Sequence, residues 1–472
     1  MKILPALAVL CLLVACQPPD PDHPDLPDRP NVIFIVADDL GWNDLSSYGN
    51  RFTETPHLDA MARDGIRFTN AYAAASLCSP SRAALMTGLH PVRVNITEHM
   101  HGNQPAGPNR KLKTPFIDQR LRKEFKTVGE LAKQAGYRTG FFGKWHLGGG
   151  DHAPDQRGFD VNVGGSHYGL PGSFFYPFFR PGALPALQDG AREGDYLTDV
   201  LTDHALDFLN DHRDTSFLLY LAYYSPHVPI EGKAELVKKY QDKRAAQTTT
   251  DTLPNPHYAA MVESIDQNVG RVVERVRELG LLERTLIFFT SDNGGLHVRE
   301  VPAFAQHTPP MKSDPLRAGK GYLYEGGMRV PYIVYGDHLP RGDNNPTPIL
   351  GQDLFNTFAE LTNQPDRTPD GESLVGLLRG DTLAERPLFW HVPHYSPQRE
   401  TPVTAMRRGR YKLVQFYEDP HFELYDLDAD LGETQNLIDR LPDVTTRMQR
   451  ELAAWKRTMG AREPEPNPEY GG

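Results

Sequence analysis

The residues best suited to chemistry surround Cys78, which is followed by Ser79-Pro80-Ser81-Arg82 and, a few positions later, by Thr87-Gly88. Pro80 suits the first turn of a helix, where its missing N–H would have no helical partner. Gly88 suits the position just past a helix end. We therefore expect a helix that begins near Cys78, so that this side chain meets unpaired N–H groups and the positive end of the helix dipole. Arg82 returns to the same face one turn later, and together these residues predict an anion-attracting site.

The cysteine count makes Cys78 stand out further. The chain of 472 residues has only three cysteines, and Cys11 and Cys16 lie in an apolar N-terminal segment. A lone cysteine is ordinarily a small buried hydrophobic residue. The string Cys-x-Pro-Ser-Arg with Thr-Gly downstream, however, resembles the signature of the type I sulfatases at every position. The resemblance implies that a formylglycine-generating enzyme or a radical sulfatase-maturating enzyme oxidises Cys78 in the unfolded chain to formylglycine, the catalytic aldehyde.

The composition is that of an ordinary globular protein, with 39% hydrophobic and 24% charged residues. The chain is long enough for more than one domain. A formal net charge of −11 argues against non-specific nucleic-acid binding, so we expect no nucleic-acid partner. An acidic protein can still hold a basic pocket for an anionic substrate.

The N-terminus predicts export. Lys2 followed by the apolar residues 3–15 is typical of a signal peptide (residues 1–15) and is too short to span a membrane. Leu-Val-Ala-Cys, ending at Cys16, looks like a bacterial lipobox, in which this cysteine carries lipid; a plain signal peptide cleaved nearby is the alternative. Residues 16–30 would then be the lipidated cysteine and a tether rich in Pro and Asp. We expect an exported bacterial lipoprotein, periplasmic or at the outer membrane or cell surface, that meets the membrane only through its lipid.

Apolar, β-branched runs alternate with helical patterns over the first 335 residues. Such runs are typical of strands buried on both faces. The alternation predicts an α/β catalytic domain at residues 31–384, with a mostly parallel central sheet sandwiched by helices and ligands at the carboxyl ends of the strands. The predicted strands are 31–37, 137–142, 217–223, 285–290 and 331–335, and the predicted helices are 56–63, 128–134, 196–210 and 257–279.

The remaining segments predict loops and a second domain. Residues 164–190 and 243–256 are rich in turn formers and predict long surface loops. Short strand patterns and a final helix then predict a smaller α+β domain with an antiparallel sheet at residues 385–460, followed by a disordered tail at 461–472. The strand patterns cover 386–392, 404–415 and 422–426, and the helix covers 443–459.

Oxygen-bearing side chains follow two of the predicted strands. Asp38 and Asp39 come directly after the first, and Asp292 and Asn293 follow the fourth. Either pair alone is commonly a helix cap or turn, but oxygens at two strand ends also suit a hard divalent cation. The sulfatase resemblance implies that these four residues hold Ca²⁺ together with the modified Cys78. Mg²⁺ fits less well because it needs a stricter octahedron with more water, and zinc lacks a second cysteine or a Cys/His spacing.

Basic and imidazole side chains complete the candidate site. Lys144 and His146, in Gly-Lys-Trp-His-Leu-Gly, follow a predicted strand and point to the same side of an extended stretch. This string is a second sulfatase-like signature, and His227 and Lys320 match further family positions. Positive groups would stabilise the charge that moves onto the bridging oxygen when a sulfate ester is cleaved. We expect this role for Arg82, Lys144, Lys320 and the metal.

The resemblance also implies proton-transfer roles. Hydrated formylglycine is a gem-diol, and one of its hydroxyls attacks sulfur, which splits a difficult displacement into two steps. Asp292 would accept the proton of that hydroxyl. His227, with Lys320, would protonate the departing alcohol. His146 would remove the proton of the second hydroxyl, so that sulfate is released and the aldehyde returns.

The substrate is the least defined element. Polar and aromatic residues between 149 and 190 would suit a sugar ring, although an ordinary surface loop has the same composition; the candidate contacts are Ser166, His167 and Arg157. A lipid-tethered bacterial sulfatase, of carbohydrate sulfatase or arylsulfatase type, is most simply an enzyme that desulfates marine polysaccharides or glycosaminoglycans. Two alternatives remain: a phosphate or phosphonate monoester hydrolase of the same alkaline-phosphatase-like superfamily, and a catalytically inert glycan-binding lipoprotein.

Overall fold

The computed structural model describes residues 26–100, 109–180, 182–248 and 253–471. The predicted signal peptide and Cys16 lie outside these ranges. Within them, no helix combines the length and apolar character that a bilayer crossing requires. Residues 26–30, expected to belong to an unpacked tether, instead dock on the body: Arg29 donates to the carbonyl of Ala135 at 2.7 Å. The hydroxyl of Tyr137 donates to the carbonyl of Pro30 at 2.9 Å.

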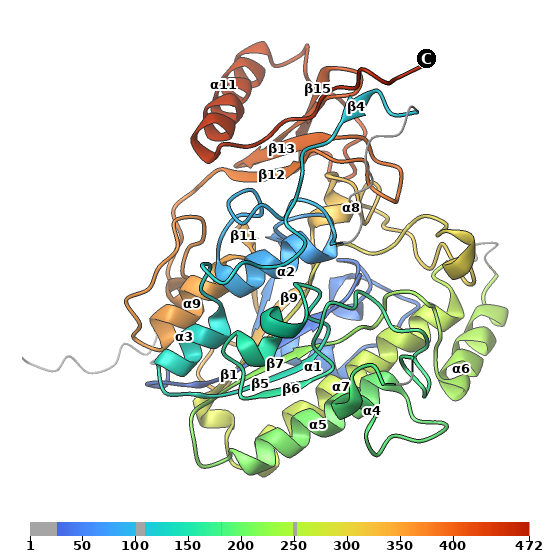
Figure 1. The fold of residues 1–472 in the computed structure, drawn as a ribbon, viewed down its shortest axis with the longest axis vertical. Helices are drawn as coiled ribbons and strands as arrows, with labels where there is room; N and C mark the ends of the chain where they lie inside the picture. Colours follow the sequence, from blue (N-terminus) through green and yellow to red (C-terminus); the bar gives the residue numbers. More distant parts are fainter. Residues whose placement is uncertain (1–25, 101–108, 181, 249–252, 472) are drawn as a thin grey trace, which may run out of the picture.

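An eight-stranded sheet forms the centre of the larger domain (Figure 1). Its strands are β1 (Asn31–Ala37), β2 (Ile66–Phe68), β5 (Arg138–Gly143), β6 (Val161–Val163), β7 (Phe217–Ala222), β8 (Thr285–Ser291), β9 (Tyr332–Tyr335) and β10 (Asp343–Asn345). They lie in the order β10-β2-β9-β8-β1-β7-β5-β6, and only β9 runs antiparallel to its neighbours. The five predicted strands are confirmed, each within one residue of its expected ends.

Strand β1 shows why this sheet needs helices on both faces. Val32 and Phe34 pack into one hydrophobic cluster, whereas Ile33 and Ile35 pack into another, because successive side chains of a strand point to opposite faces. The second cluster includes side chains of α1 (Pro56–Asp64), α5 (Leu197–Asp211) and α7 (Pro256–Glu278). The first includes side chains of α2 (Cys78–Thr87), α3 (Val128–Gln134) and α9 (Asp353–Leu361). The predicted sandwich is confirmed.

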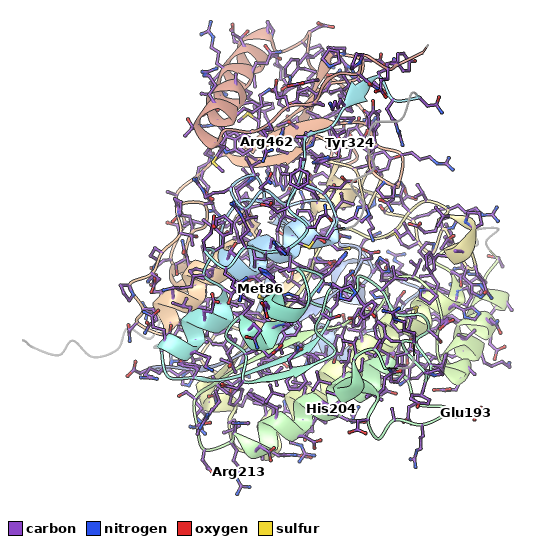
Figure 2. The ribbon with its side chains drawn as sticks, in the orientation of Figure 1. Met86, Glu193, His204, Arg213, Tyr324 and Arg462 are labelled. Atoms are coloured by element: carbon purple, nitrogen blue, oxygen red, sulfur yellow. The ribbon has the colours of Figure 1, made fainter. Side chains whose placement is uncertain are left out.

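Helix α2 lies inside the molecule, between the sheet and the smaller domain. Figure 2 shows Met86 of this helix in the interior, whereas Glu193 and Arg213 lie at the periphery. Every residue of α2 is buried. A helix that is buried all round needs small or apolar side chains on every face, and the sequence of α2 supplies alanines, serines and leucine around a single arginine. The one charged side chain, Arg82, therefore needs a buried partner.

The smaller domain is an antiparallel sheet with one helix, as predicted. Its strands β12 (Leu388–Val392), β13 (Val403–Arg408), β14 (Tyr411–Phe416) and β15 (His421–Asp426) lie in chain order. Helix α11 (Pro442–Met459) packs on one face through Met448 and Leu452. The other face meets the larger domain at Tyr72 and Leu77. The stretch 404–415 is two strands, because the chain turns at Gly409, whose φ is 55°.

Segments predicted to be loops or disordered are more ordered than expected. Phe174 and Phe178, in the predicted surface loop 164–190, are fully buried, because such aromatic side chains gain more from burial than a short loop loses by being ordered. Helix α6 (Ala234–Ala245) runs into the predicted loop 243–256, and β16 (Glu465–Pro466), in the predicted disordered tail, pairs with β4 (Leu112–Lys113). The remaining short elements are β3 (Ala71–Tyr72), β11 (Ile349–Leu350), α4 (Pro185–Gln188), α8 (Glu325–Met328) and α10 (Val375–Leu378).

Candidate active site

The predicted site residues meet at the carboxyl edge of four neighbouring strands. In the sheet, Ala37 at the end of β1 pairs with Ser291 of β8, and Gly143 of β5 pairs with Ala222 of β7. The residues that follow these strand ends therefore emerge at one level. They are Asp38 and Asp39 after β1, Lys144 after β5, His227 after β7, and Asp292 and Asn293 after β8, and all six are buried.

Cys78 is the first residue of α2, as the sequence predicts. The helix ends at Gly88, whose φ is 68° and whose N–H donates to the carbonyl of Ala84 at 2.8 Å. The Sγ atom of Cys78 lies 3.9 Å from Oδ1 of Asp39. Burial raises the pKa of the Cys78 thiol to about 12. The encoded thiol is therefore protonated at neutral pH and is a poor nucleophile, since the thiolate is the reactive form.

The carboxylate of Asp39 accepts hydrogen bonds from two other residues of the site. Its Oδ2 accepts a hydrogen bond from Nζ of Lys320 at 2.7 Å, and its Oδ1 accepts one from Nδ2 of Asn293 at 2.8 Å. Burial is the largest single influence and alone would raise the pKa of Asp39, but Lys320, His227 and Lys144 together outweigh it and hold this pKa below its ordinary value. Asp39 is therefore an ionised carboxylate. Its backbone is left-handed, with a φ of 66°, a conformation that aspartate adopts more readily than most residues.

Asp38 lies between two cations. Nζ of Lys144 is 2.9 and 2.7 Å from its two carboxylate oxygens. Nη2 of Arg82 is 3.4 Å from Oδ1 of Asp38, and Nε of the same guanidinium donates to Oδ2 of Asp292 at 2.8 Å. Burial raises the pKa of Asp38 to about 7 even against the opposing charge of Lys144. The buried cluster thus sets three carboxylates against the cations Arg82, Lys144 and Lys320.

These residues fit a divalent cation. Donor atoms of Asp38, Asp39, Cys78 and His227 lie within 4.8 Å of one another. Within the described ranges, Oδ1 of Asn293 is buried without a hydrogen-bond partner, which is unusual because nearly all buried polar atoms are paired. A hard cation ligated by oxygens would satisfy this atom. Sulfur is a poor ligand for such a cation, whereas the oxygens of hydrated formylglycine would suit it.

The two histidines differ in their hydrogen bonds. Nδ1 of His227 donates to the carbonyl of Val228 at 2.9 Å, so that Nε2 carries the lone pair and accepts from Nζ of Lys320 at 3.0 Å. Burial and the charge of Lys320 lower the pKa of His227 well below its ordinary value. Burial likewise lowers the pKa of His146, whose Nδ1 has no hydrogen-bond partner among the described residues. Both imidazoles are therefore neutral, and both have a nitrogen able to take a proton.

Of the three predicted substrate contacts, only His167 lines the pocket. His167 lines the pocket beside Tyr168, with the two ring centres 4.2 Å apart. The carbonyl of Ser166 accepts the backbone N–H of His146 at 2.9 Å, and its hydroxyl accepts the N–H of Tyr168 at 3.3 Å. Ser166 therefore holds the backbone of His146 and is not among the residues that line the pocket.

The prediction that Arg157 contacts substrate is wrong. Its side chain is fully buried and does not line the pocket. Its guanidinium donates to the carbonyls of Leu121 and Phe125 and to Oε1 of Glu130. Because its guanidinium makes these hydrogen bonds, Arg157 stabilises the chain around α3. A sugar-binding arginine and a structural one look alike in sequence, because the distinction depends on residues about thirty positions away.

The pocket at Cys78 has a volume of about 460 Å³ and two chemically different parts. Five of the predicted catalytic residues line it, and all five are buried: Cys78, Lys144, His146, His227 and Lys320. The same lining includes His99, Glu300 and Gln398, which the sequence analysis missed. These three come from separate segments of the chain and carry no motif, so no sequence signal pointed to them.

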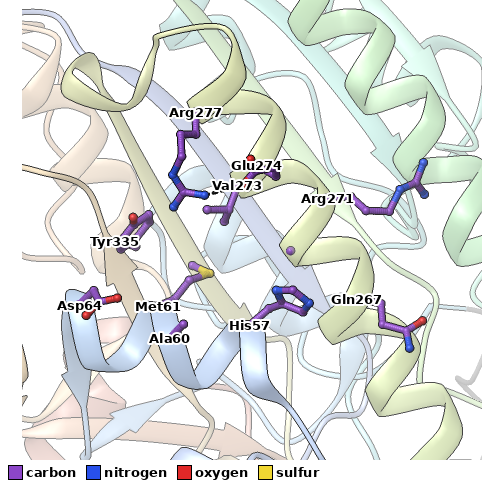
Figure 3. A pocket seen from close by; sticks show the side chains of 11 residues that line it. His57, Ala60, Met61, Asp64, Gln267, Arg271, Val273, Glu274, Arg277 and Tyr335 are labelled. Carbon is purple, nitrogen blue, oxygen red and sulfur yellow. Dashed lines mark hydrogen bonds and ion pairs between the residues drawn. The ribbon is translucent and has the colours of Figure 1, made fainter.

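A second pocket, of about 400 Å³, lies between α1 and α7 and contains none of the predicted site residues (Figure 3). His57 packs against the position of Gly270, where an added Cβ would lie 2.5 Å from the imidazole ring. Arg277 and Glu274 in its wall form an ion pair with each other. This second pocket therefore has no part in the predicted chemistry.

Known proteins resemble this chain over almost its whole described length. A family profile described as Sulfatase matches residues 30–364, and one described as N-sulphoglucosamine sulphohydrolase, C-terminal, matches residues 318–458. A sulfatase of Formosa agariphila is 31% identical over 90% of this chain and 88% of its own. N-acetylgalactosamine-6-sulfatase of Sus scrofa is 32% identical over 89% of this chain and 78% of its own. The crystal structure of Ps i-CgsB in complex with k-i-k-neocarrahexaose has a TM-score of 0.73 at 28% identity, and covers 90% of this chain and 92% of that chain.

Proposed function

The chain belongs to the sulfatase family and is a sulfatase, and on this premise we propose that it removes sulfate from sulfated carbohydrates with a formylglycine made from Cys78 and a bound Ca²⁺. The observation that carries the proposal is a buried cluster of three carboxylates and three cations, of which Lys144 and Lys320 line one pocket with Cys78. Two relatives support the substrate class: one is named for a sulfated sugar, and another was crystallised with k-i-k-neocarrahexaose.

When present, the calcium ion and the hydrated formyl group supply positive charge and a nucleophilic oxygen. The chain's own residues would orient the sulfate ester and transfer protons to and from the reacting oxygens. Arg82 is fixed by Asp292 and by the carbonyl of Lys144, to which its Nη1 donates at 2.7 Å. This fixed guanidinium and Nζ of Lys144 would neutralise the oxygens of a sulfate ester. Because these groups are buried, such charges act more strongly than they would in water.

Lys320 and His227 form the pair best placed to protonate the departing alcohol. Burial is the largest single influence and lowers the pKa of Lys320, but Asp39 and the neighbouring acidic groups together more than compensate and raise this pKa above its ordinary value. Lys320 is therefore a stable ammonium, and it shares a proton with Nε2 of His227 at 3.0 Å. That proton can pass to the leaving oxygen. His146, with an unpaired Nδ1, would take up the proton released when sulfate departs.

The burial of Cys78 bears on maturation, and the sequence around Cys16 bears on export. Cys78 is only 3% exposed and opens a helix that is buried throughout, so a maturating enzyme would have to reach it before the chain folds. The lipobox-like sequence at Cys16 supports export as a lipoprotein anchored in a membrane. Incorporation of labelled palmitate that is lost in Cys16→Ser would test the anchor.

Mass spectrometry of the tryptic peptide that contains Cys78, from protein made in its native host, tests the proposed nucleophile. We expect the aldehyde or its hydrate, and a thiol retained in every molecule would refute the proposal. Sulfate release from sulfated galactosides should be lost in Cys78→Ala, which removes few packing atoms and should leave the fold intact. Matched aryl sulfate and aryl phosphate substrates test the reaction class, and faster turnover of the phosphate would point to the alternative hydrolase.

A further inference from the structure

The pocket lining carries a negative charge, on the half-buried Glu300, that the proposed chemistry does not use. Glu300 lines the pocket. Nε2 of Gln398 donates to its Oε1 at 3.1 Å, and the N–H of Val301 donates to its Oε2 at 3.3 Å. Within the described part of the chain, no lysine, arginine or histidine forms an ion pair with Glu300. Neutral donors therefore hold the carboxylate and leave its charge uncompensated.

The position of this carboxylate is set by both domains. Gln398 lies between β12 and β13 of the smaller domain and is only 4% exposed. Its carbonyl accepts the hydroxyl of Tyr322, from the larger domain, at 2.9 Å. The backbone N–H of Glu300 donates to Oγ1 of Thr308 at 3.2 Å. A side chain fixed from several directions can discriminate between ligands, because little of its conformational freedom remains to be lost on binding.

Apolar and aromatic surfaces flank the carboxylate. Val301 is 54% exposed, which is unusual for a large hydrophobic residue of this protein, and Phe304 lies beside it in the pocket lining. The adjacent rings of His167 and Tyr168 belong to the same lining. Exposed apolar groups at a pocket mark a ligand site more often than chance. Such surfaces suit the C–H faces of a sugar ring, whose hydroxyls can reach polar groups at the edge.

The pocket lining therefore carries both signs of charge, with the buried cations Lys144 and Lys320 and the half-buried carboxylate of Glu300. An ionised carboxylate only accepts hydrogen bonds, so a ligand group at Glu300 must be a donor such as a hydroxyl or an N–H. A second sulfate or a uronate there would bring like charge and no donor. We infer that Glu300 determines specificity: the pocket takes a sugar that carries one sulfate and presents hydroxyl or N–H groups to Glu300, and it rejects a second anionic group at that place. This inference rests on the proposed sulfatase action on carbohydrates.

The test compares kcat/KM for pairs of sulfated galactosides and N-acetylgalactosaminides that differ only by a second sulfate. Measurement at pH 8 keeps ordinary histidines neutral, which matters because His99 and His167 also line the pocket. We expect the native enzyme to prefer a monosulfated sugar by at least about tenfold, the size of a like-charge penalty near a protein surface. Glu300→Gln keeps the shape and the acceptor for Gln398 but removes the charge. It should reduce the preference at least about fivefold, as expected when that penalty is lifted.

Two controls separate this inference from its premise. Glu193→Gln makes the same change of net charge at an exposed residue of the periphery (Figure 2) and should leave the preference unaltered. Hydrolysis of 4-nitrophenyl sulfate has no second group to reject, so its kcat/KM measures any effect of Glu300→Gln on sulfate cleavage itself, which cancels in the ratio that defines the preference. An unchanged preference in Glu300→Gln, or faster turnover of the disulfated sugars by the native enzyme, overturns the role of Glu300 and leaves the proposed sulfatase action on carbohydrates standing. No sulfate release from any sugar, with 4-nitrophenyl sulfate still cleaved, overturns the carbohydrate proposal and this inference with it.

Discussion

A buried lysine joins the two domains, and its removal tests how much a buried charge contributes to stability. Lys412 of β14 is fully buried, with Nζ 3.0 Å from Oε1 of Glu325 and 2.8 Å from Oε1 of Glu433. Glu325 belongs to α8 of the larger domain and is also paired with Arg329. Lys412→Met retains most of the apolar stem but leaves the two carboxylates without this cation.

The expected loss follows from burial. Breaking a buried ion pair by removing one partner costs about 3–5 kcal/mol, because the remaining charge stays in a medium of low polarity. Burial raises the pKa of Glu433 to about 7, so this carboxyl can bind a proton and limit the loss near neutral pH. Without Lys412 the pKa of Glu433 rises further. The folded variant then binds a proton at Glu433 that the unfolded variant releases, so the variant loses stability as pH rises. We expect a loss of about 3 kcal/mol at pH 6 and a larger one at pH 8.

Urea denaturation followed by tryptophan fluorescence measures this loss, since Trp390 is buried where the domains meet. Lys238→Met is the matched control. Lys238 pairs with Asp242 at 2.6 Å, a separation similar to those of Lys412, but its side chain is 69% exposed. An exposed pair contributes about 0–1 kcal/mol. Equal losses in the two variants would refute the argument that burial, and not the short N–O distance, sets the cost.

Three further changes test other parts of the structure. Gly143→Ala should lower the free energy of unfolding by about 3 kcal/mol or more, because φ is 106° and an added Cβ would lie 1.9 Å from the carbonyl oxygen of Ala222; an unchanged melting temperature would contradict this. Arg157→Met should lower the melting temperature but leave KM unchanged, because the guanidinium is buried away from the pocket; a raised KM would make it a substrate contact after all. Burial raises the pKa of Glu98 from 4.5 to about 8, so its contribution to stability is complete below pH 4.5 and is lost as pH rises towards 8. Melting temperatures of Glu98→Gln should therefore fall less between pH 5 and 8 than those of the native protein, and parallel profiles would count against the buried acid.

The sheet could be predicted because its strands are marked by their own residues. A run such as Asn31–Ala37 is apolar at every position, which only a strand covered on both faces requires. The antiparallel direction of β9 could not be predicted, because an apolar run looks the same in either direction. The ordered, packed conformation of the loops could not be predicted either. Phe174 and Phe178 are buried through contacts with distant segments, and no local pattern records such contacts.

Some residues of the candidate site could likewise be predicted from the sequence, and others could not. Strand ends place Asp38 and Asp292 together by topology alone, since parallel strands bring their carboxyl ends to one edge. Glu300 could not be recognised, because its importance comes from Gln398, about a hundred positions later in the chain, and from a pocket that exists only after folding. Sequence motifs thus mark the groups that would meet the sulfate, whereas the residues that would meet the rest of the substrate emerge only from the packing of two domains.

Charge balance gives a reason why the cluster would need both a metal and a modified cysteine. When Asp38, Asp39 and Asp292 are all ionised and no ligand is present, three carboxylates and three cations cancel, so the bare cluster has little attraction for an anion. A divalent cation would leave an excess of two positive charges, which one sulfate ester only partly neutralises, and the site would then favour the anion strongly in its buried setting. The same burial raises the pKa of Cys78 to about 12, so only about one thiol in 10⁵ is ionised at pH 7. A site buried deeply enough to hold sulfate thus disables its own thiol, and a hydrated aldehyde would supply oxygen where sulfur cannot act.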